Sequence, residues 1–384
     1  MAAPVVALLV TSGATTGDAL TPTSNLACAT NIVSTWPLRQ IANETITVPV
    51  NATQIASMGP AARAGYGGLI LFGTSARASL PAVLATLQRE RPAHDAMLVM
   101  TDEEGGGVMR LTNFVSYFPW AQTMGHTETA AQITATARRV GRQLVAAGLN
   151  TDLAPVADLD GRAILPGESD PDGLRSFSGS TAVAASDAVA FMRGLLSAGV
   201  TPVVKHFPGL GHATRNTDYG PAATLPWSRL QHAGLIPFER AITAGATAVM
   251  LSNASVPGLT NLPAGLSPAV VNVLRTTLGF RGLIVTDSLG AGAISALHLS
   301  EPAASVVALR AGADLILFGS ASSPGASLAE ATKVSNAILG AVKSGALSRS
   351  TLIVAAAQVL ATRNQLSCPV ATTTTSPTTT TSIP

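Results

Sequence analysis

Short apolar runs alternate with alanine-rich segments of helical period along most of this 384-residue chain. The runs predict strands at 67–72, 96–101, 149–155, 201–205, 247–252, 282–286 and 313–318. The segments between them predict helices at 127–147, 181–198, 228–244 and 267–278. A glycine follows each helix: Gly148, Gly199, Gly245 and Gly279. This alternation is the sequence form of repeated β–α units, which build a parallel sheet.

Polar residues follow the carboxyl ends of many predicted strands instead of gathering at one. An open α/β sheet binds its ligand at a single switch point, whereas a closed barrel uses the ends of all its strands. We therefore expect an α/β fold with a single (β/α)8 TIM-type barrel whose eighth strand is poorly defined by the pattern. The expected organisation is a signal-like or disordered segment at 1–27, the barrel at 28–368 and a Thr-rich disordered tail at 369–384.

The composition argues against several classes of function. A net charge of +2 with 11% charged residues provides no basic stripe for a nucleic acid. No segment is continuously apolar for the roughly 20 residues of a membrane helix, so no integral membrane segment is expected. Neither a G-x-G-x-x-G sequence after a strand nor a Walker loop occurs, so no nucleotide cofactor is indicated. The expected partner is a substrate held in a pocket, and the default expectation is a monomer.

The two ends of the chain carry features of an exported protein. Residues 5–10 form a short apolar run that resembles the core of a signal peptide without its positively charged start. Because a closed barrel brings its ends together, we expect a disulfide between Cys28 and Cys368. Residues 25–28 resemble a lipoprotein processing site, but Asn25 stands where an apolar residue is wanted. We expect a secreted or cell-wall-associated protein.

The segment 203–211 ends a predicted strand in a cationic pair and a Pro- and Gly-rich loop. A barrel strand delivers polar groups to a ligand in this way. Lys205 is one of only three lysines, which makes it hard to explain as surface decoration. A lysine that caps a strand for solubility is the alternative. Lys205 and His206 are therefore candidate ligand-binding residues.

An acidic cluster at 102–104 follows the second predicted strand, and glycines and Arg110 come after it. Glycines let the backbone approach a ligand closely. The Asp102 carboxylate is suited to accept hydrogen bonds from paired sugar hydroxyls at its two oxygens. An acidic turn in solvent explains Glu103 and Glu104 well and Asp102 less well.

Two further polar positions follow predicted strands. Arg175 closes the long loop after 149–155, where it could grip a ligand or an acidic neighbour, or hold the loop shut by an ion pair. Asp287 directly follows a strand expected to be buried on both faces, where a charge is costly unless the site uses it. A carboxylate aimed into a barrel mouth is a natural nucleophile for a glycosyl centre and would form a covalent glycosyl-enzyme intermediate.

Together these residues resemble glycoside hydrolase family 3, specifically its bacterial β-N-acetylhexosaminidase branch. The family's D-x-E-G-G-x-V-x-R is similar to 102–110, its R-S-F to 175–177, its K-H-F-P-G-x-G to 205–211, and its strand-end nucleophile to Asp287. The resemblance implies a barrel that hydrolyses terminal β-linked N-acetylglucosamine with retention, without metal or cofactor. It implies that Asp287 attacks the anomeric carbon and that the following residues hold the sugar: Asp102, Arg110, Arg175, Lys205 and His206.

One loop departs from that branch. Where the branch has Asp-x-His, with the histidine as mobile general acid/base, this chain has Asn216, Thr217 and Asp218. We expect Asp218 to replace the histidine, because it occupies the same position on a glycine-rich loop that can bring it over the sugar. Burial and the Asp287 carboxylate would both raise its pKa, as a proton donor requires. His212 is the alternative donor.

Other functions stay open on the sequence. We expect an exo-acting enzyme for cell-wall-derived or related glycans, and the enzymatic alternatives are a family 3 β-glucosidase and a glycoside phosphorylase. A catalytically impaired sugar-binding wall protein is the third alternative, suggested by the missing histidine and the Thr-rich tail. The intact Asp287, Lys205 and His206 argue against such decay.

Overall fold

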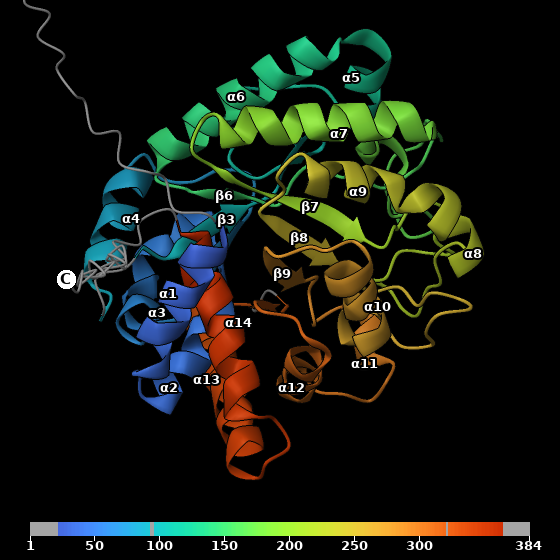
Figure 1. Ribbon diagram of the computed structural model, residues 1–384. Coiled ribbons are helices and arrows are strands. Elements are labelled where there is room, and N and C mark those ends of the chain that lie inside the picture. Colours follow the sequence, from blue (N-terminus) through green and yellow to red (C-terminus); the bar gives the residue numbers. More distant parts are fainter. Residues whose placement is uncertain (1–21, 93–95, 320–321, 364–384) are drawn as a thin grey trace, which may run out of the picture.

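A computed structural model describes residues 22–92, 96–319 and 322–363. Eight parallel strands pair in the order β10-β1-β2-β3-β6-β7-β8-β9. A parallel bridge between Val285 and Leu315 joins the two outer strands of this order, so the sheet closes into a barrel (Figure 1). The strands are β1 (Ile46–Asn51), β2 (Gly68–Phe72), β3 (Leu98–Thr101), β6 (Thr151–Asp152), β7 (Thr201–Phe207), β8 (Ala248–Leu251), β9 (Leu283–Thr286) and β10 (Ile316–Leu317). The expected (β/α)8 barrel is confirmed.

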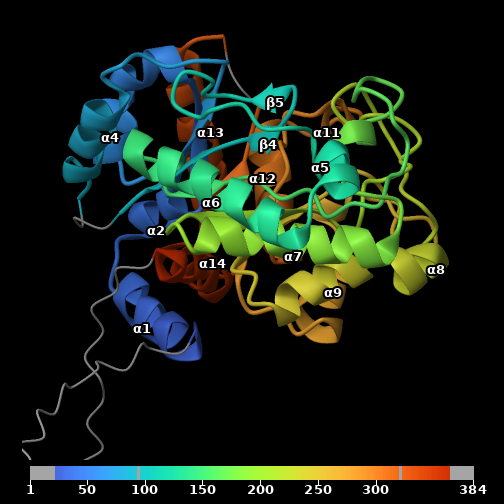
Figure 2. The same cartoon turned by 90° about the horizontal axis from the view of Figure 1, so that it is seen from above.

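Helices surround the barrel on its outside (Figure 2). Those between or after the strands are α3 (Gly59–Arg63), α4 (Leu80–Arg89), α6 (Ala130–Ala147), α7 (Thr181–Leu196), α9 (Ile236–Thr243), α10 (Pro268–Asn272), α12 (Glu301–Ala311) and α13 (Pro324–Lys343). Shorter elements decorate the loops: the hairpin β4 (Glu103–Gly105) and β5 (Val108–Met109), and α5 (Ala121–Thr127), α8 (Trp227–Arg229) and α11 (Gly292–Ser295). Outside the repeat lie α1 (Pro22–Ser34), α2 (Leu38–Glu44) and α14 (Arg349–Thr362).

The eighth strand is β1, which the apolar pattern did not resolve. Its sequence, Ile-Thr-Val-Pro-Val-Asn, is interrupted by Thr47 and Pro49, so it does not read as a continuous apolar run. Two predicted strands are shorter than expected, since 149–155 yields only Thr151–Asp152 and 313–318 only Ile316–Leu317. The glycines predicted to end the helices do adopt the left-handed conformation typical of such positions. The φ angles of Gly148, Gly199, Gly245 and Gly279 lie between 67° and 96°.

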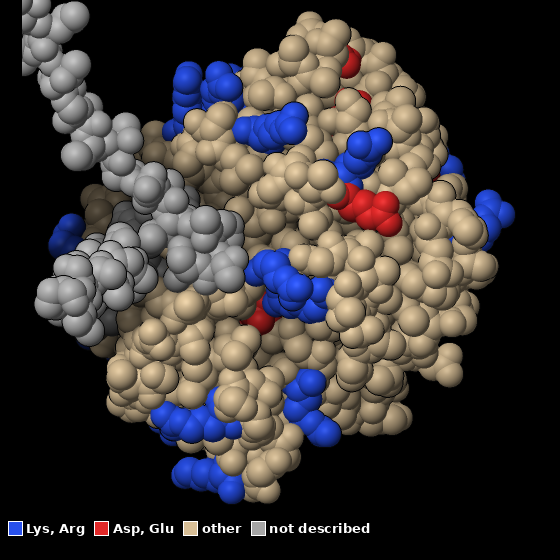
Figure 3. Space-filling model, viewed as in Figure 1, with Lys and Arg blue, Asp and Glu red and all other residues tan. Residues whose placement is uncertain are grey.

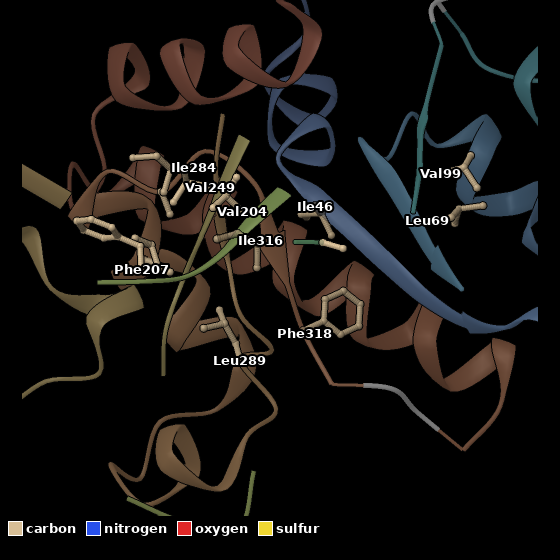
Figure 4. Packing of buried hydrophobic residues seen from close by; sticks show 14 of the residues in the cluster. Ile46, Leu69, Val99, Val204, Phe207, Val249, Ile284, Leu289, Ile316 and Phe318 are labelled. Carbon is tan, nitrogen blue, oxygen red and sulfur yellow. The ribbon is translucent and has the colours of Figure 1, made fainter. Parts of the chain in front are cut away.

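Successive side chains along each strand belong alternately to two apolar cores. Val203, Met250 and Val285 belong to a cluster inside the barrel. Their neighbours along the chain, such as Val204 and Ile284, belong to the larger cluster between the strands and the helices, part of which Figure 4 shows. Burial on both faces is the pattern expected of a parallel barrel, and it leaves only the ends of the strands for polar side chains.

Helix α14 covers the amino-terminal end of the barrel. Gln358 donates from Nε2 to the carbonyls of Arg281 and Gly282, both at 2.7 Å, just before β9 begins. Its neighbour Val359 packs with the residues of the barrel interior. This end of the barrel is therefore closed by protein.

Helix α1 packs on α14, so the first and last described helices are neighbours. Cys28 lies in α1, but Cys368 lies outside the described residues, and their disulfide stays a prediction. On the face seen in Figure 3, lysines and arginines occur in separate patches and form no continuous stripe. Within the described ranges, no helix is both long and apolar enough to cross a membrane.

Close packing of α6 on α7 generates a prediction. A Cβ added to Gly194 would lie 2.5 Å from both the Ala137 Cβ and the Thr134 carbonyl oxygen. Gly194→Ala should therefore lower the free energy of unfolding by about 1–3 kcal/mol, because the backbones must separate. Gly340→Ala is the control, since a Cβ there meets nothing within 4 Å, and it should be neutral or stabilise by up to about 1 kcal/mol. Urea unfolding measures both, and equal effects would contradict the packing argument.

Candidate active site

A cavity of about 470 Å³ opens at the carboxyl ends of the strands. Its floor includes Ile70, Met250 and Leu317, which belong to the core inside the barrel. Its walls contain seven residues predicted from the sequence: Asp102, Arg110, Arg175, Lys205, His206, Asp218 and Asp287. His212 is not among the lining residues. It is exposed, and its backbone N–H donates to Asp160 at 3.5 Å.

Lys205 stands at the centre of the charged groups. It lies near the end of β7, where its side chain is 2% exposed. Its Nζ is 2.8 Å from an Asp102 oxygen and 2.6 Å from a Glu104 oxygen. Burial alone would lower the pKa of Lys205, but the two carboxylates outweigh it and raise that pKa. Lys205 is therefore a paired, charged residue of the pocket wall and not a solubilising cap.

Glu104 is shared between two cations. Arg175 donates to it through Nε at 2.7 Å and through Nη2 at 2.9 Å, which makes a bidentate pair. Burial works against ionisation, yet the charges of Arg175 and Lys205 hold the pKa of the Glu104 carboxyl well below its usual range. The acidic-turn interpretation is thus wrong for both glutamates, because Glu103 and Glu104 are 0% and 5% exposed. Arg175 thus makes the expected bidentate contact with an acidic neighbour, and the same ion pair ties its loop to β4.

His206, which follows Lys205 in the motif, is held by a partner that the sequence did not reveal. His206 Nδ1 lies 2.7 Å from a carboxylate oxygen of Asp158, which follows β6. Asp158 also accepts from the backbone N–H of Leu210 at 2.7 Å. On the other side of the ring, Nε2 lies 3.4 Å from Arg175 Nη2. Asp158 was recognisable only as an acid after a strand, and its partner lies 48 residues later.

The long loop after β6 is braced by its own ion pairs. Arg162 bonds to Asp160 at 2.6 Å and to Asp170 at 2.7 Å. Arg175 Nη1 donates to the Pro171 carbonyl at 2.8 Å. These contacts fix the segment that carries Arg175 and that contributes Pro166, Gly167 and Pro171 to the cavity wall.

The Glu103 side chain holds the β4–β5 hairpin in place through hydrogen bonds to the backbone that follows β5. One of its carboxyl oxygens accepts from the backbone N–H groups of Arg110 and Leu111, at 3.0 and 2.8 Å. Its own N–H donates to Asp152 at 2.9 Å. Because Glu103 lies between Asp102 and Glu104, this fixes both residues and the start of Arg110 relative to the barrel. Desolvation raises the pKa of Glu103 to about 7 and that of Asp152 well above its usual value.

Asp287 directly follows β9, as the sequence predicted. Its backbone N–H donates to the Leu251 carbonyl at 3.1 Å, which continues the pairing of β9 with β8. One carboxyl oxygen accepts from the Ser288 N–H at 2.6 Å. Asp287 is partly exposed and lines the cavity. A carboxylate is thus fixed at the end of a rigid strand and open to a ligand.

The loop that carries Asp218 is anchored in this structure. The carbonyls of Asp218 and Thr217 accept from Gly292 and Ala293 of α11, at 3.0 and 2.9 Å. The Asn216 side chain accepts from the Asp218 N–H at 2.9 Å. The loop was expected to bring Asp218 over a bound sugar, and in this structure its backbone holds the residue at the cavity.

Asp218 is exposed at the mouth, but desolvation on the cavity side raises its pKa, and the negative charge of Asp287 raises it further. Arg175 and His206 act in the opposite direction. The cavity therefore contains two carboxyl groups, Asp218 and Asp287, that interact electrostatically, and the direction of the effect favours the protonated form of Asp218.

Cations and carboxylates that converge at the carboxyl end of a closed barrel define the site of a barrel enzyme. The family model described as "Glycosyl hydrolase family 3 N terminal domain" matches residues 56–362. The chain therefore belongs to glycoside hydrolase family 3.

Similar proteins carry consistent names. "Beta-hexosaminidase LpqI" of Mycobacterium tuberculosis is 36% identical over 58% of this chain and 58% of its own length. An "Uncharacterized secreted glycosyl hydrolase" of Arthroderma benhamiae is 34% identical over 78% of this chain and 85% of its own. The crystal structure of a β-N-acetylhexosaminidase from Beutenbergia cavernae superimposes with a TM-score of 0.76 at 29% identity, covering 86% of this chain and 99% of that one.

The raised pKa of Glu103 generates a prediction about stability. Its native pKa of about 7 exceeds the usual 4.5, so the native state retains a proton that the unfolded chain releases between these pH values. Stability should therefore fall as pH rises through this window, by on the order of 3 kcal/mol. Glu103→Gln keeps the acceptor for the hairpin but removes this loss.

Chemical unfolding of wild type and Glu103→Gln at pH 5 and pH 8 checks the prediction. The variant should gain stability relative to wild type at pH 8 and differ little from it at pH 5. Glu168→Gln is the control, because the Glu168 side chain is 65% exposed. A pH-independent difference between wild type and Glu103→Gln would show that the buried carboxyl does not titrate as described.

Proposed function

We propose that this protein is a retaining, exo-acting β-N-acetylglucosaminidase. The observation that supports it most is the presence in one cavity of Asp287, Asp218 and the buried cluster around Lys205. The names of the similar proteins favour an N-acetylhexosamine substrate. The aligned region spans only 58% of the LpqI sequence, so the assignment to this chain rests on its own site.

The charged cluster is suited to hold a neutral sugar. Asp102 and Glu104 pair with Lys205 and Arg175, so this part of the wall offers strong hydrogen-bond donors and acceptors whose charges are paired. In this role Asp102 accepts from sugar hydroxyls, while Lys205, Arg110, Arg175 and His206 donate to or orient the ring. Since the apolar barrel core closes the floor, a chain end fits better than a chain interior, which supports exo action.

The two carboxyl groups then divide the chemistry. Asp287 attacks the anomeric carbon as the glycosidic bond breaks, and the proton of Asp218 passes to the leaving oxygen. A glycosyl ester on Asp287 results. Asp218, now a carboxylate, takes a proton from water, the water oxygen bonds to the anomeric carbon, and the ester bond breaks to regenerate Asp287. Two inversions retain the β configuration.

We propose cell-wall-derived or related glycans as the natural substrate, and a secreted or wall-associated protein, on the basis of the signal-like segment and the secreted relative. Residues 1–21 and 364–384 lie outside the described residues, and helix α1 (Pro22–Ser34) runs across the expected boundary at 28. The boundaries at 28 and 368 stay predictions.

Turnover of chromogenic glycosides tests the proposal. The protein should hydrolyse an aryl N-acetyl-β-glucosaminide and leave the matching β-glucoside almost untouched. Asp287→Asn should lower kcat by at least about 10³-fold while the thermal unfolding temperature stays near that of wild type, because the nucleophile is lost. A fluorinated glycosyl donor should label Asp287, and a label on Asp102 or Asp158 would refute the assignment.

A reaction in phosphate buffer distinguishes a hydrolase from a glycoside phosphorylase. Reaction in phosphate buffer should release free N-acetylglucosamine, whereas a phosphorylase would release the 1-phosphate. Preferred turnover of the β-glucoside would instead identify a β-glucosidase.

The acid/base assignment has its own test. Because a general acid must be protonated, kcat/KM should fall as pH rises through the raised pKa of Asp218. Asp218→Ala should remove this limb, lower turnover of substrates with poor leaving groups by about 10²-fold or more, and allow azide to restore turnover of activated substrates. His212→Ala is the matched control and should resemble wild type. The reverse pattern would make His212 the donor.

A further inference from the structure

Tyr219 lies at the mouth of the cavity and is not used by the mechanism above. It lines the cavity and is 61% exposed, so its side chain meets both the cavity and solvent. We propose that Tyr219 forms a binding site for the leaving-group sugar, the pyranose joined to the terminal residue. This inference rests on the proposed function.

The exposure of the lining residues distinguishes a closed end and an open end of the cavity. Lys205 and Glu104 are 2% and 5% exposed, and they lie with the apolar floor at the closed end. Asp218 and Tyr219 are exposed at the open end. A terminal sugar that enters this cavity places its reacting ring among the buried groups and its glycosidic oxygen toward the opening. The next sugar then lies at the mouth.

The position of Tyr219 in the sequence also places it on the leaving-group side of the cavity. In a retaining glycosidase the general acid is on the side of the leaving group, because it protonates the oxygen that departs. Tyr219 directly follows Asp218, the proposed acid. Both residues line the cavity and are exposed, so a sugar whose oxygen receives the proton of Asp218 lies at the mouth that Tyr219 also lines.

The backbone of this segment is fixed before any ligand binds. Besides the hydrogen bonds from α11, the segment touches Gly292 so closely that a Cβ there would lie 2.8 Å from the Tyr219 carbonyl carbon and 2.7 Å from the Gly220 nitrogen. Across the mouth, the Asn216 N–H donates to the Glu168 carbonyl at 2.8 Å, and Arg215 pairs with the Glu168 carboxylate at 2.7 Å. Tyr219 thus stands on a held loop, which lowers the cost of ordering it on binding.

The chemistry of the side chain suits a pyranose. A tyrosine offers a flat apolar face to the C–H groups of a sugar ring, and its hydroxyl can exchange hydrogen bonds with the sugar hydroxyls. The described residues give the Tyr219 hydroxyl no hydrogen bond within the protein, so it is available to a ligand. Binding energy at this site would act on the glycosylation step, in which the leaving group is still attached.

Two substrates with different leaving groups test the proposal. A β-1,4-linked disaccharide of N-acetylglucosamine fills the site, whereas N-acetyl-β-glucosaminyl fluoride has no second sugar. Tyr219→Ala should lower kcat/KM for the disaccharide by about tenfold and change that for the fluoride by less than about twofold. Tyr219→Phe should keep most of the disaccharide activity, since the ring face remains.

Tyr117→Ala is the matched control, because Tyr117 is 70% exposed and does not line the cavity, and it should leave both substrates unaffected. An unchanged disaccharide rate in Tyr219→Ala, or an equal loss on both substrates, would overturn the leaving-group site while the glycosidase assignment stands. A wild-type protein that turns over neither substrate would instead overturn the proposed function, and this inference with it.

Discussion

The site depends on one buried carboxylate, Glu104, that Lys205 and Arg175 share. A buried charge is tolerated only when it is paired and hydrogen-bonded, and removing one partner leaves the others uncompensated. Glu104 lies in β4, Lys205 lies near the end of β7, and Arg175 closes the long loop after β6. The pairing therefore joins three segments that are distant in sequence, and the pocket wall exists only when all three are in place.

The amino-terminal end of the barrel is closed by protein, whereas the carboxyl-terminal end contains the cavity. At the amino-terminal end, Glu44 pairs with Arg91 and Arg363 where the first and last parts of the barrel domain meet, and α14 closes the interior. At the carboxyl end, the polar side chains face a cavity. This separation is general to such barrels and lets the loops around the site vary without loss of the closed core.

The sequence predicted the elements whose signal is local. Apolar runs and glycine stops located seven strands, and the motifs placed Asp102, Lys205 and Asp287 at strand ends. The sequence did not predict contacts between residues that are distant in the chain. Nothing near Glu104 in the sequence shows that Arg175 pairs with it. Likewise, the internal proline of β1 hid a strand that only pairing with β2 and β10 defines. The anchored Asp218 loop depends on α11, more than 70 residues further on.

The electrostatic contact between Asp218 and Asp287 has a consequence for the timing of the proposed reaction. While Asp287 is a free carboxylate, its charge helps Asp218 to keep a proton. In the proposed reaction, esterification of Asp287 would remove that charge and lower the pKa of Asp218, which favours the carboxylate form that the second step needs as its base. In the proposed mechanism, the covalent state of Asp287 would therefore set the acidity of Asp218.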